Sequence, residues 1–350
     1  MWSYFFAFCI ATGATLILTP MVIALAKKTN AMDKPDARKV HKEPVARIGG
    51  MAIFASFMIT TGIAFLFYDF SDEASYEIFG LIAAGTFIFL LGIIDDYFNI
   101  PAKVKLLGQI AAALILTVGF DVKIEFITDP FGDYLFLEQF AVPLTCFWLV
   151  GLTNTVNLID GLDGLAAGVV IIASFTIFLV AFEQNVFLIA LLTSIIAGAA
   201  LGFLYYNFNP AKIFMGDSGS MFLGFMLAGI SIIGAVKSAA TIALIVPILA
   251  LGLPIMDTAF AIIRRYRGGV PIFKPDRGHL HHRLLDLGFT QRQAVLLMYV
   301  ISALLGLSAV TLNEVSGQIA IGIVVVVLFV VLYGAKKLGI FHMNEPPKTL

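Results

Sequence analysis

Charged side chains are scarce in this chain: Asp, Glu, Lys and Arg together account for 13% of its 350 residues. In soluble globular domains the share is about a quarter. Apolar residues account for 60%, and the mean hydropathy is +0.97. This balance excludes an ordinary water-soluble protein and predicts an integral membrane protein, because so much apolar surface has to be solvated by lipid.

Cysteine is almost absent as well. Cys9 and Cys146 both lie in apolar runs, which excludes a disulfide framework and a cysteine-based zinc site. The first apolar run, 2–26, has no basic segment before it and no small-residue cleavage pattern after it. It is therefore predicted to be a retained membrane helix rather than a signal peptide.

Eleven apolar runs are close to or above the length of about 17 residues that lets a helix cross a bilayer. Strands of a lipid-facing barrel would instead alternate apolar and polar residues. The sequence predicts an all-α polytopic membrane protein of about eleven transmembrane helices, formed by one domain over residues 1–350. The runs are 2–26, 48–68, 78–94, 106–120, 139–157, 164–182, 186–204, 221–236, 238–263, 294–312 and 318–335.

The connections between these helices differ sharply in charge. Those that fall on one side of the membrane hold 20 of the 22 Lys and Arg residues, and the other side holds only Lys123 and Lys237. Basic residues collect on the cytoplasmic side, so the N-terminus is predicted to lie outside and the C-terminus in the cytoplasm. Among the outward connections, 121–138 fits either a small hairpin or an unstructured loop.

Four connections on the predicted cytoplasmic side carry carboxylates, amides or imidazoles at the ends of apolar helices, where such groups are costly unless they are paired, hydrated or metal-bound. They read DDYFNIPAKVKLLGQ (95–109), NTVNLIDGLDGLAAG (154–168), NPAKIFMGDSGS (209–220) and RRYRGGVPIFKPDRGHLHHRLLDLG (264–288). We expect this face of the membrane to carry the active site.

Each cluster also has a structural interpretation. Asp95 and Asp96 fit a solvated helix end, and Asp217 fits the N-cap of the following helix. Asp160 and Asp163 fit either one face of a helix or a glycine-rich turn. The trio His279, His281 and His282 suggests zinc only weakly, because no cysteine accompanies it.

Taken together, the clusters favour phosphoryl transfer to a lipid phosphate. Carboxylates and the amide of Asn157 are hard oxygen ligands that favour Mg²⁺. Glycines in 161–168 and 216–219 are expected to let backbone N–H groups approach a phosphate. Basic side chains suited to phosphate oxygens are Arg264, Arg265, Arg267, Lys103 and Lys105. The rival from another class is a secondary transporter with Asp257 as its coupling group, although no inverted repeat accompanies it.

The chain resembles the polyprenyl-phosphate N-acetylhexosamine-1-phosphate transferases. The resemblance rests on VHKEPVARIGG (40–50), the 95–109 and 154–168 stretches above, FMGDSGS (214–220) and PDRGHLHHRLLDLG (275–288). HLHH after PDRG is similar to the branch that uses UDP-GlcNAc, as in bacterial undecaprenyl-phosphate GlcNAc-1-phosphate transferases that start teichoic acid, O-antigen or common-antigen synthesis. The alternative within the family is a UDP-MurNAc-pentapeptide phosphotransferase.

The resemblance implies a role for each matching residue. It implies catalysis by Asp95 and Asp96, an Mg²⁺ site (with Mn²⁺ as a substitute) at Asp217 and Asn157, and contact with the acceptor phosphate at Lys105. It implies nucleotide and sugar binding by Asp160, Gly161, Leu162, Asp163, Phe214, Arg265, His279, His281 and His282. The partners it implies are UDP-GlcNAc, undecaprenyl phosphate and the lipids of a bacterial inner membrane, with a homodimer compatible and no nucleic acid. Attack by the lipid phosphate in one step and a covalent enzyme intermediate both remain open.

Overall fold

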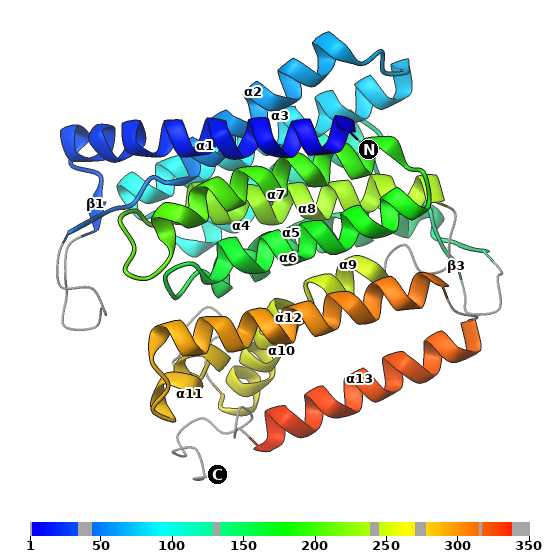
Figure 1. Cartoon of the computed structure of the whole chain (residues 1–350). Helices are drawn as coiled ribbons and strands as arrows, with labels where there is room; N and C mark the ends of the chain where they lie inside the picture. The colour runs from blue at the N-terminus through cyan, green and yellow to red at the C-terminus, as the bar shows by residue number, and fades with distance from the viewer. Residues whose placement is uncertain are drawn as a thin grey trace.

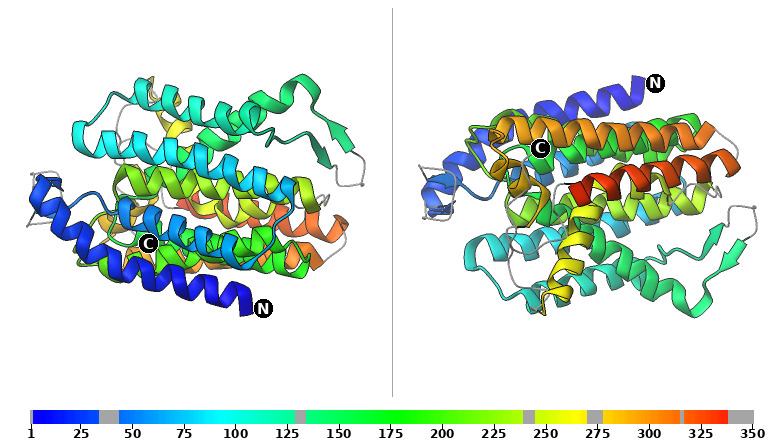
Figure 2. Two further views of the ribbon diagram at one scale, coloured as in Figure 1. Left: turned by 90° about the horizontal axis from the view of Figure 1, so that it is seen from above. Right: turned by 90° about the horizontal axis from the view of Figure 1, so that it is seen from below.

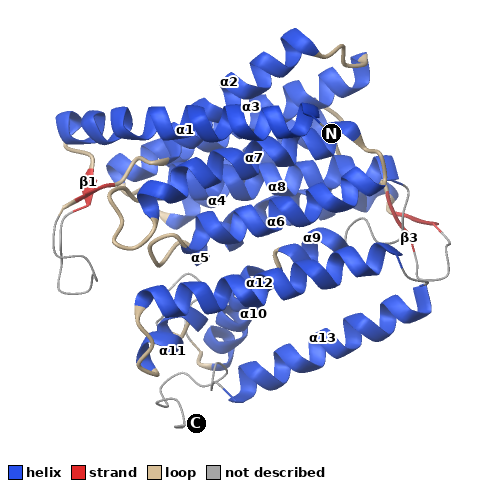
Figure 3. Cartoon of the chain, in the orientation of Figure 1, coloured by secondary structure: helices blue, strands red, loops and turns tan. Residues whose placement is uncertain are grey.

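The computed structural model describes residues 2–33, 44–128, 134–238, 245–269, 278–314 and 317–337, and within them the protein is predominantly helical (Figure 3). The long helices are α1 (Trp2–Thr29), α2 (Gly50–Phe67), α3 (Asp72–Phe98), α4 (Ala102–Leu114), α5 (Ala141–Ile159), α6 (Leu165–Glu183), α7 (Phe187–Asn207), α8 (Gly216–Ser238), α12 (Gln291–Glu314) and α13 (Gly317–Lys337). Shorter ones are α9 (Ile245–Ala250), α10 (Gly252–Arg267) and α11 (Leu280–Asp286).

Nine helices in the described part of the chain are long and apolar enough to cross a membrane. This confirms an all-α polytopic membrane protein. Ten of the predicted runs correspond to helices of the structure, most of them with bounds that agree to within a few residues. Two of these helices begin earlier than predicted: α3 begins at Asp72 and α8 at Gly216. The side of the membrane on which each terminus lies stays a prediction.

The predicted membrane helix over 238–263 is wrong. Residues 239–244 lie outside the described part, and the rest divides at Leu251 into α9 and α10. Pro247 and Pro254 lie in the first turns of these two helices, where a missing backbone N–H leaves no hydrogen bond unmade. The short α10 crosses the long helices steeply (Figure 2).

The bundle is built around α7 and α8. In their membrane-length windows 83% and 89% of residues are buried, against 22% in α1. Helices α1 and α6 pack on α7, while α3 and α5 pack on α8. Helices α1 and α13 lie at opposite edges, and most long helices run roughly side by side (Figure 1).

Two antiparallel strand pairs mark opposite ends of the bundle (Figure 1). Strand β1 (Met32–Asp33) pairs with β2 (Val45–Ala46), and β3 (Phe126–Thr128) pairs with β4 (Tyr134–Phe136). The second pair confirms the hairpin interpretation of the 121–138 connection. A short 3₁₀ turn, Glu138–Phe140, leads from it into α5, and a π-helical turn, Ile115–Gly119, extends α4.

Close helix crossings depend on glycine. A Cβ placed on Gly50 of α2 would lie 2.2 Å from the backbone nitrogen of Gly219 in α8. A Cβ on Gly92 of α3 would lie 2.4 Å from Cα of Ser218. Helix α8 therefore meets α2 and α3 backbone to backbone at its first turn, which fixes the position of that turn.

Gly50→Ala is expected to destabilise the protein by about 1–3 kcal/mol or more, because the added methyl group meets backbone that cannot move aside. Thermal unfolding in detergent measures the effect. Gly62→Ala in the same helix is the matched control, since nothing lies within 4 Å of a Cβ there. Equal melting temperatures for the two variants would contradict the proposed crossing.

Candidate active site

The first turn of α8 is held by a carboxylate from another helix. The N–H groups of Asp217 and Ser218 donate to Asp96 of α3 over 2.8 and 3.1 Å, and the Ser218 hydroxyl donates over 2.6 Å. The Asp96 side chain is fully buried. Asp96 therefore supplies the cap of α8, and the interpretation of Asp217 as its own N-cap is wrong, because Asp217 lies inside the first turn.

Backbone N–H groups at this turn are consequently not available to a phosphate. The expectation that 216–219 would cradle a phosphate through its backbone is wrong for Asp217 and Ser218. In the second glycine-rich stretch, the N–H of Gly164 donates to Asn207 Oδ1 over 3.0 Å. Side chains, rather than these N–H groups, have to bind substrate phosphates here.

Sequence reasoning missed Arg47. Its Nε lies 3.6 Å from Asp96 Oδ1, and its Nη1 donates to Asn99 Oδ1 over 3.0 Å. It lies in the stretch VHKEPVARIGG, which carried the resemblance without any assigned role. Its basic character and position were visible in the sequence, but its partner depends on how α3 is placed.

Phe214 lies where the segment before α2 pairs with the segment before α8. Its N–H donates to the Ala46 carbonyl over 2.7 Å, and its carbonyl accepts from Gly49 over 3.0 Å. The N–H of Gly50 donates to the Met215 carbonyl over 2.8 Å. Phe214 is thus held at the same end of the bundle as Asp217.

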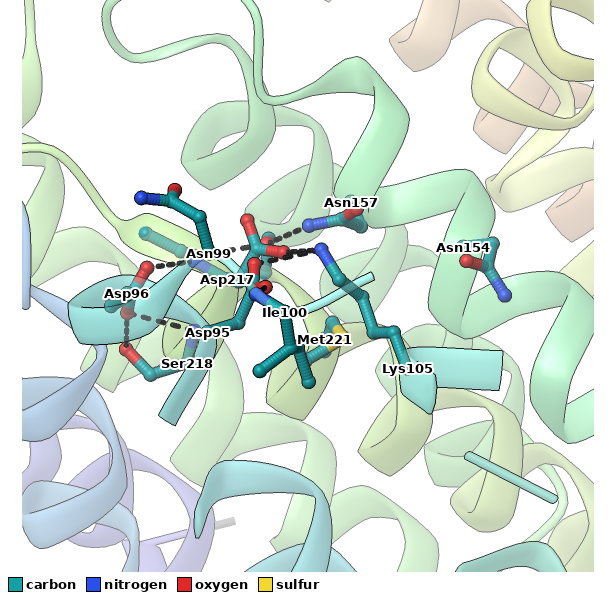
Figure 4. A network of polar contacts seen from close by, with 12 residues as sticks. Asp95, Asp96, Asn99, Ile100, Lys105, Asn154, Asn157, Asp217, Ser218 and Met221 are labelled. Carbon is teal, nitrogen blue, oxygen red and sulfur yellow. Dashed lines mark hydrogen bonds and ion pairs between the residues drawn. The ribbon is translucent and has the colours of Figure 1, made fainter. Parts of the chain in front are cut away.

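Two carboxylates share one ammonium group at the centre of the site (Figure 4). Lys105 Nζ, from α4, donates to Asp95 Oδ2 over 2.8 Å and also to Asp217 Oδ2. The other Asp95 oxygen accepts the N–H of Ile100 over 2.8 Å. The Asp95 and Asp217 carboxyl groups are themselves within hydrogen-bonding reach of each other. Lys105 thus neutralises part of a carboxylate pair that would otherwise repel itself.

Asn157 joins this cluster from the last turn of α5. Its Nδ2 donates over 2.9 Å to Ser220 Oγ, three residues after Asp217 on α8. One turn earlier, Asn154 and Gln109 exchange hydrogen bonds between α5 and α4. The amide pair fixes the spacing of the two helices that carry Asn157 and Lys105.

Asp160 and Asp163 lie in a turn between α5 and α6. The prediction that they share one face of a helix is therefore wrong, and the prediction of a glycine-rich turn is confirmed. Asp163 Oδ2 accepts from the Asn209 side chain over 2.9 Å and from the Ala211 N–H over 3.1 Å, which ties the turn to the loop before α8. Burial, together with the charges of nearby Asp217, Asp96 and Asp163, raises the pKa of Asp160 to about 8. Leu162 between them is buried.

His281 packs directly against this turn. A Cβ on Gly161 would lie 2.7 Å from His281 Nε2, so only glycine fits there. Burial, with the neighbouring His282 and His279, lowers the pKa of His281 to about 3, and the ring is neutral at pH 7. Its Nδ1 is buried and has no hydrogen-bond partner among the residues that the structure describes. The His282 ring centre lies 4.3 Å from that of His281.

Asp257 of α10 organises the start of α11. Its carboxylate lies 2.8 Å from His279 Nδ1 and accepts the N–H of Leu280 over 2.8 Å. A group engaged in this way is a poor coupling group for ion transport. Arg265 lies in the last turn of the same helix and is 7% exposed.

The donor set fits a hard cation that is bound partly by its substrate. No group of three or more His, Cys, Asp or Glu residues arranged to hold a metal occurs in the described segments. Asp95, Asp217 and Asn157, however, bring three oxygen-bearing side chains around the Lys105 ammonium. Mg²⁺ characteristically takes one or two carboxylates and completes its shell with water and substrate phosphates.

Comparisons with known proteins identify the family of the chain. A family model described as glycosyl transferase family 4 matches residues 78–235. A relative from Bacillus subtilis (strain 168) is 39% identical over 345 residues, which cover 98% of this chain and 94% of the relative. The chain belongs to glycosyl transferase family 4. That relative is named a probable undecaprenyl-phosphate N-acetylglucosaminyl 1-phosphate transferase.

Two further family 4 relatives carry related names. A decaprenyl-phosphate N-acetylglucosaminephosphotransferase from Mycolicibacterium smegmatis is 35% identical over 91% of this chain and 84% of its own length. An undecaprenyl-phosphate alpha-N-acetylglucosaminyl 1-phosphate transferase from Escherichia coli K12 is 30% identical over 80% and 76%. The resemblance to the polyprenyl-phosphate N-acetylhexosamine-1-phosphate transferases is confirmed, and so is the prediction that the chain is an enzyme.

Asp96→Asn is expected to lower the stability of this family 4 enzyme by about 1–3 kcal/mol, because an amide NH₂ would face the donors of Asp217 or Ser218. Asp95→Asn is expected to keep the stability of the protein, because the amide oxygen can still accept the N–H of Ile100 and the repulsion between two adjacent carboxylates is removed. The variant is expected to lose activity, because the Asp95 carboxylate is gone. Thermal unfolding and transferase assays on both variants test this. An inactive Asp96→Asn protein with wild-type stability would show that Asp96 acts in the chemistry itself.

Asp160→Asn is expected to raise the melting temperature of the metal-free protein, increasingly so from pH 5 to pH 8. Because the folded pKa of about 8 exceeds the ordinary value of about 4, the folded state binds a proton that the unfolded state releases. Wild-type stability therefore falls as the pH rises between these values. Unfolding in EDTA across this range gives the measurement. A difference between variant and wild type that does not change with pH would contradict it.

Proposed function

We propose that the enzyme transfers GlcNAc-1-phosphate from UDP-GlcNAc to undecaprenyl phosphate and releases UMP. The observation that carries the proposal is the Asp95–Lys105–Asp217 cluster, to which α3, α4 and α8 contribute at one end of a membrane-spanning bundle. A lipid phosphate and a water-soluble nucleotide can meet only at such an edge. The names of the family 4 relatives support the donor and the acceptor.

The charge distribution supports a cytoplasmic active site in a bacterial plasma membrane. The connections at the end that holds the site belong to the set that carries 20 of the 22 basic residues. Under the positive-inside rule this asymmetry supports a cytoplasmic location for that end, on the side where nucleotide sugars are made. The homodimer that the resemblance implies stays a prediction.

In the transfer, an oxygen of the acceptor phosphate attacks the β-phosphorus of UDP-GlcNAc, and the bond from that phosphorus to the bridging oxygen breaks. Asp95 orients the acceptor phosphate or takes its remaining proton, and Lys105 pairs with its charge. Both Asp95 oxygens already accept hydrogen bonds. We propose attack by the lipid phosphate in one step, with Asp95 acting on the acceptor phosphate rather than as the nucleophile.

Asp217 and Asn157 would hold Mg²⁺, with Mn²⁺ as a substitute, beside Asp95. An ion bound there would neutralise negative charge on the pyrophosphate as UMP departs. The turn 160–163, with Phe214, Arg265 and the histidines 279, 281 and 282, would bind the uridine and sugar portions. Since His281 is buried against Gly161, its role would be to hold the 160–163 turn in position.

The test is UMP release by the purified enzyme in nanodiscs with Mg²⁺ and undecaprenyl phosphate. UDP-GlcNAc is expected to react, and UDP-MurNAc-pentapeptide is not. Asp217→Asn should lower kcat by at least about 100-fold, since charge neutralisation is worth several kcal/mol. Asp121→Asn, which removes the same charge from an exposed position in the outer connection, is the control and should keep its rate. Turnover of the pentapeptide substrate alone would overturn the proposed donor.

A further inference from the structure

Lys105 holds an unusual position for a phosphate-binding lysine. Its ammonium is directed at two aspartates (Figure 4). The Asp95 side chain is 6% exposed, that of Asp217 19% and that of Lys105 20%. The carboxylate pair is therefore largely withdrawn from water, and Lys105 is its counter-ion.

A divalent ion held by Asp217 would need an oxygen that Lys105 contacts. Mg²⁺ binds carboxylate oxygen at about 2.0–2.1 Å and tolerates little distortion. An ammonium hydrogen-bonded to Asp217 Oδ2 would stand within a few ångströms of the ion and repel it. Lys105 and the ion therefore compete for Asp217 Oδ2.

The Lys105 ammonium can move away from the two carboxylates. Its four-carbon stem is flexible, in contrast to the rigid fork of an arginine. It starts from the first turn of α4, and its side chain is about as exposed as that of Asp217 and more exposed than that of Asp95. A negatively charged acceptor phosphate bound beside it would offer the ammonium a replacement for the carboxylates.

We propose that Lys105 is an exchangeable counter-ion, which neutralises Asp95 and Asp217 in the empty site and turns to the acceptor phosphate when a divalent ion binds Asp217. The inference rests on the proposed function, because it assumes the metal and acceptor sites described there. Its consequence is that metal and acceptor bind cooperatively. Linkage requires each to strengthen the other by the same factor, typically 5- to 150-fold.

The experiment measures Mn²⁺ affinity by the loss of its free-ion paramagnetic resonance signal. Protein in nanodiscs is titrated with and without a polyprenyl phosphate and with no nucleotide sugar, so that no turnover occurs. The variants are wild type, Lys105→Met and Lys103→Met. Lys103 is exposed two residues earlier on α4, so its loss removes the same charge without touching the pair.

In the wild type and in Lys103→Met, the acceptor is expected to tighten Mn²⁺ binding about tenfold, within the usual range of coupling. Without acceptor, Lys105→Met should bind Mn²⁺ about tenfold more tightly than wild type, because the competitor is gone. Adding acceptor should then change its affinity less than threefold. Lys105→Arg keeps the positive charge and should retain the coupling between acceptor and Mn²⁺. If Lys105→Met does not fold, Lys105→Arg and Lys105→Gln form the test instead, and the coupling must then be lower in Lys105→Gln than in Lys105→Arg.

Two failures are distinguishable. Full coupling in Lys105→Met, or metal affinity that does not rise without acceptor, overturns the exchange while leaving the proposed function in place. Wild-type protein that binds no Mn²⁺, or whose binding survives Asp217→Asn unchanged, overturns the proposed metal site as well.

Discussion

The arrangement of the candidate active site depends on the cap that Asp96 of α3 supplies to the first turn of α8. Gly216, at a φ of 71°, turns the chain so tightly that a side chain there would collide with the Arg47 carbonyl. Asp96 then accepts the N–H groups of the turn from α3. A buried carboxylate is tolerable only with such partners. The contact therefore joins α3 to α8 in one orientation, and it places Asp217 beside Asp95.

Aspartates also accept backbone N–H groups from neighbouring segments elsewhere around the site. Asp257 accepts from His279 and Leu280 and so fixes the start of α11 against α10. Asp163 fixes the loop before α8 through Asn209 and Ala211. In each case an aspartate on one helix or turn satisfies the backbone of another connection. Connections that would be mobile on their own are thus cross-linked near the membrane surface, where water competes for every hydrogen bond.

Much of the fold could be predicted from apolar length alone, because a spanning helix has to satisfy its backbone internally. The split at Leu251 was hidden, since Pro247 and Pro254 interrupt a run that is otherwise mostly apolar. For the site, sequence indicated the right residue types at one end of the bundle. It could not separate Asp95 from Asp96, which are neighbours with opposite surroundings. Only the register of α3 against α8 directs Asp95 toward Lys105 and Asp96 onto the first turn of α8.

The arrangement concentrates negative charge where the apolar bundle tolerates it least. Asp95 and Asp217 adjoin each other, and within this cluster Lys105 is the cation in direct contact with the pair. Two adjacent carboxylates weaken the folded state and are relieved when positive charge arrives. Lys105 alone leaves one of these two negative charges unmatched. A divalent ion would match both and leave the charge of Lys105 unmatched, and on our proposal the acceptor phosphate would then take that charge. The charges of the site would therefore balance when ion and acceptor are both bound, which is the condition under which transfer has to occur.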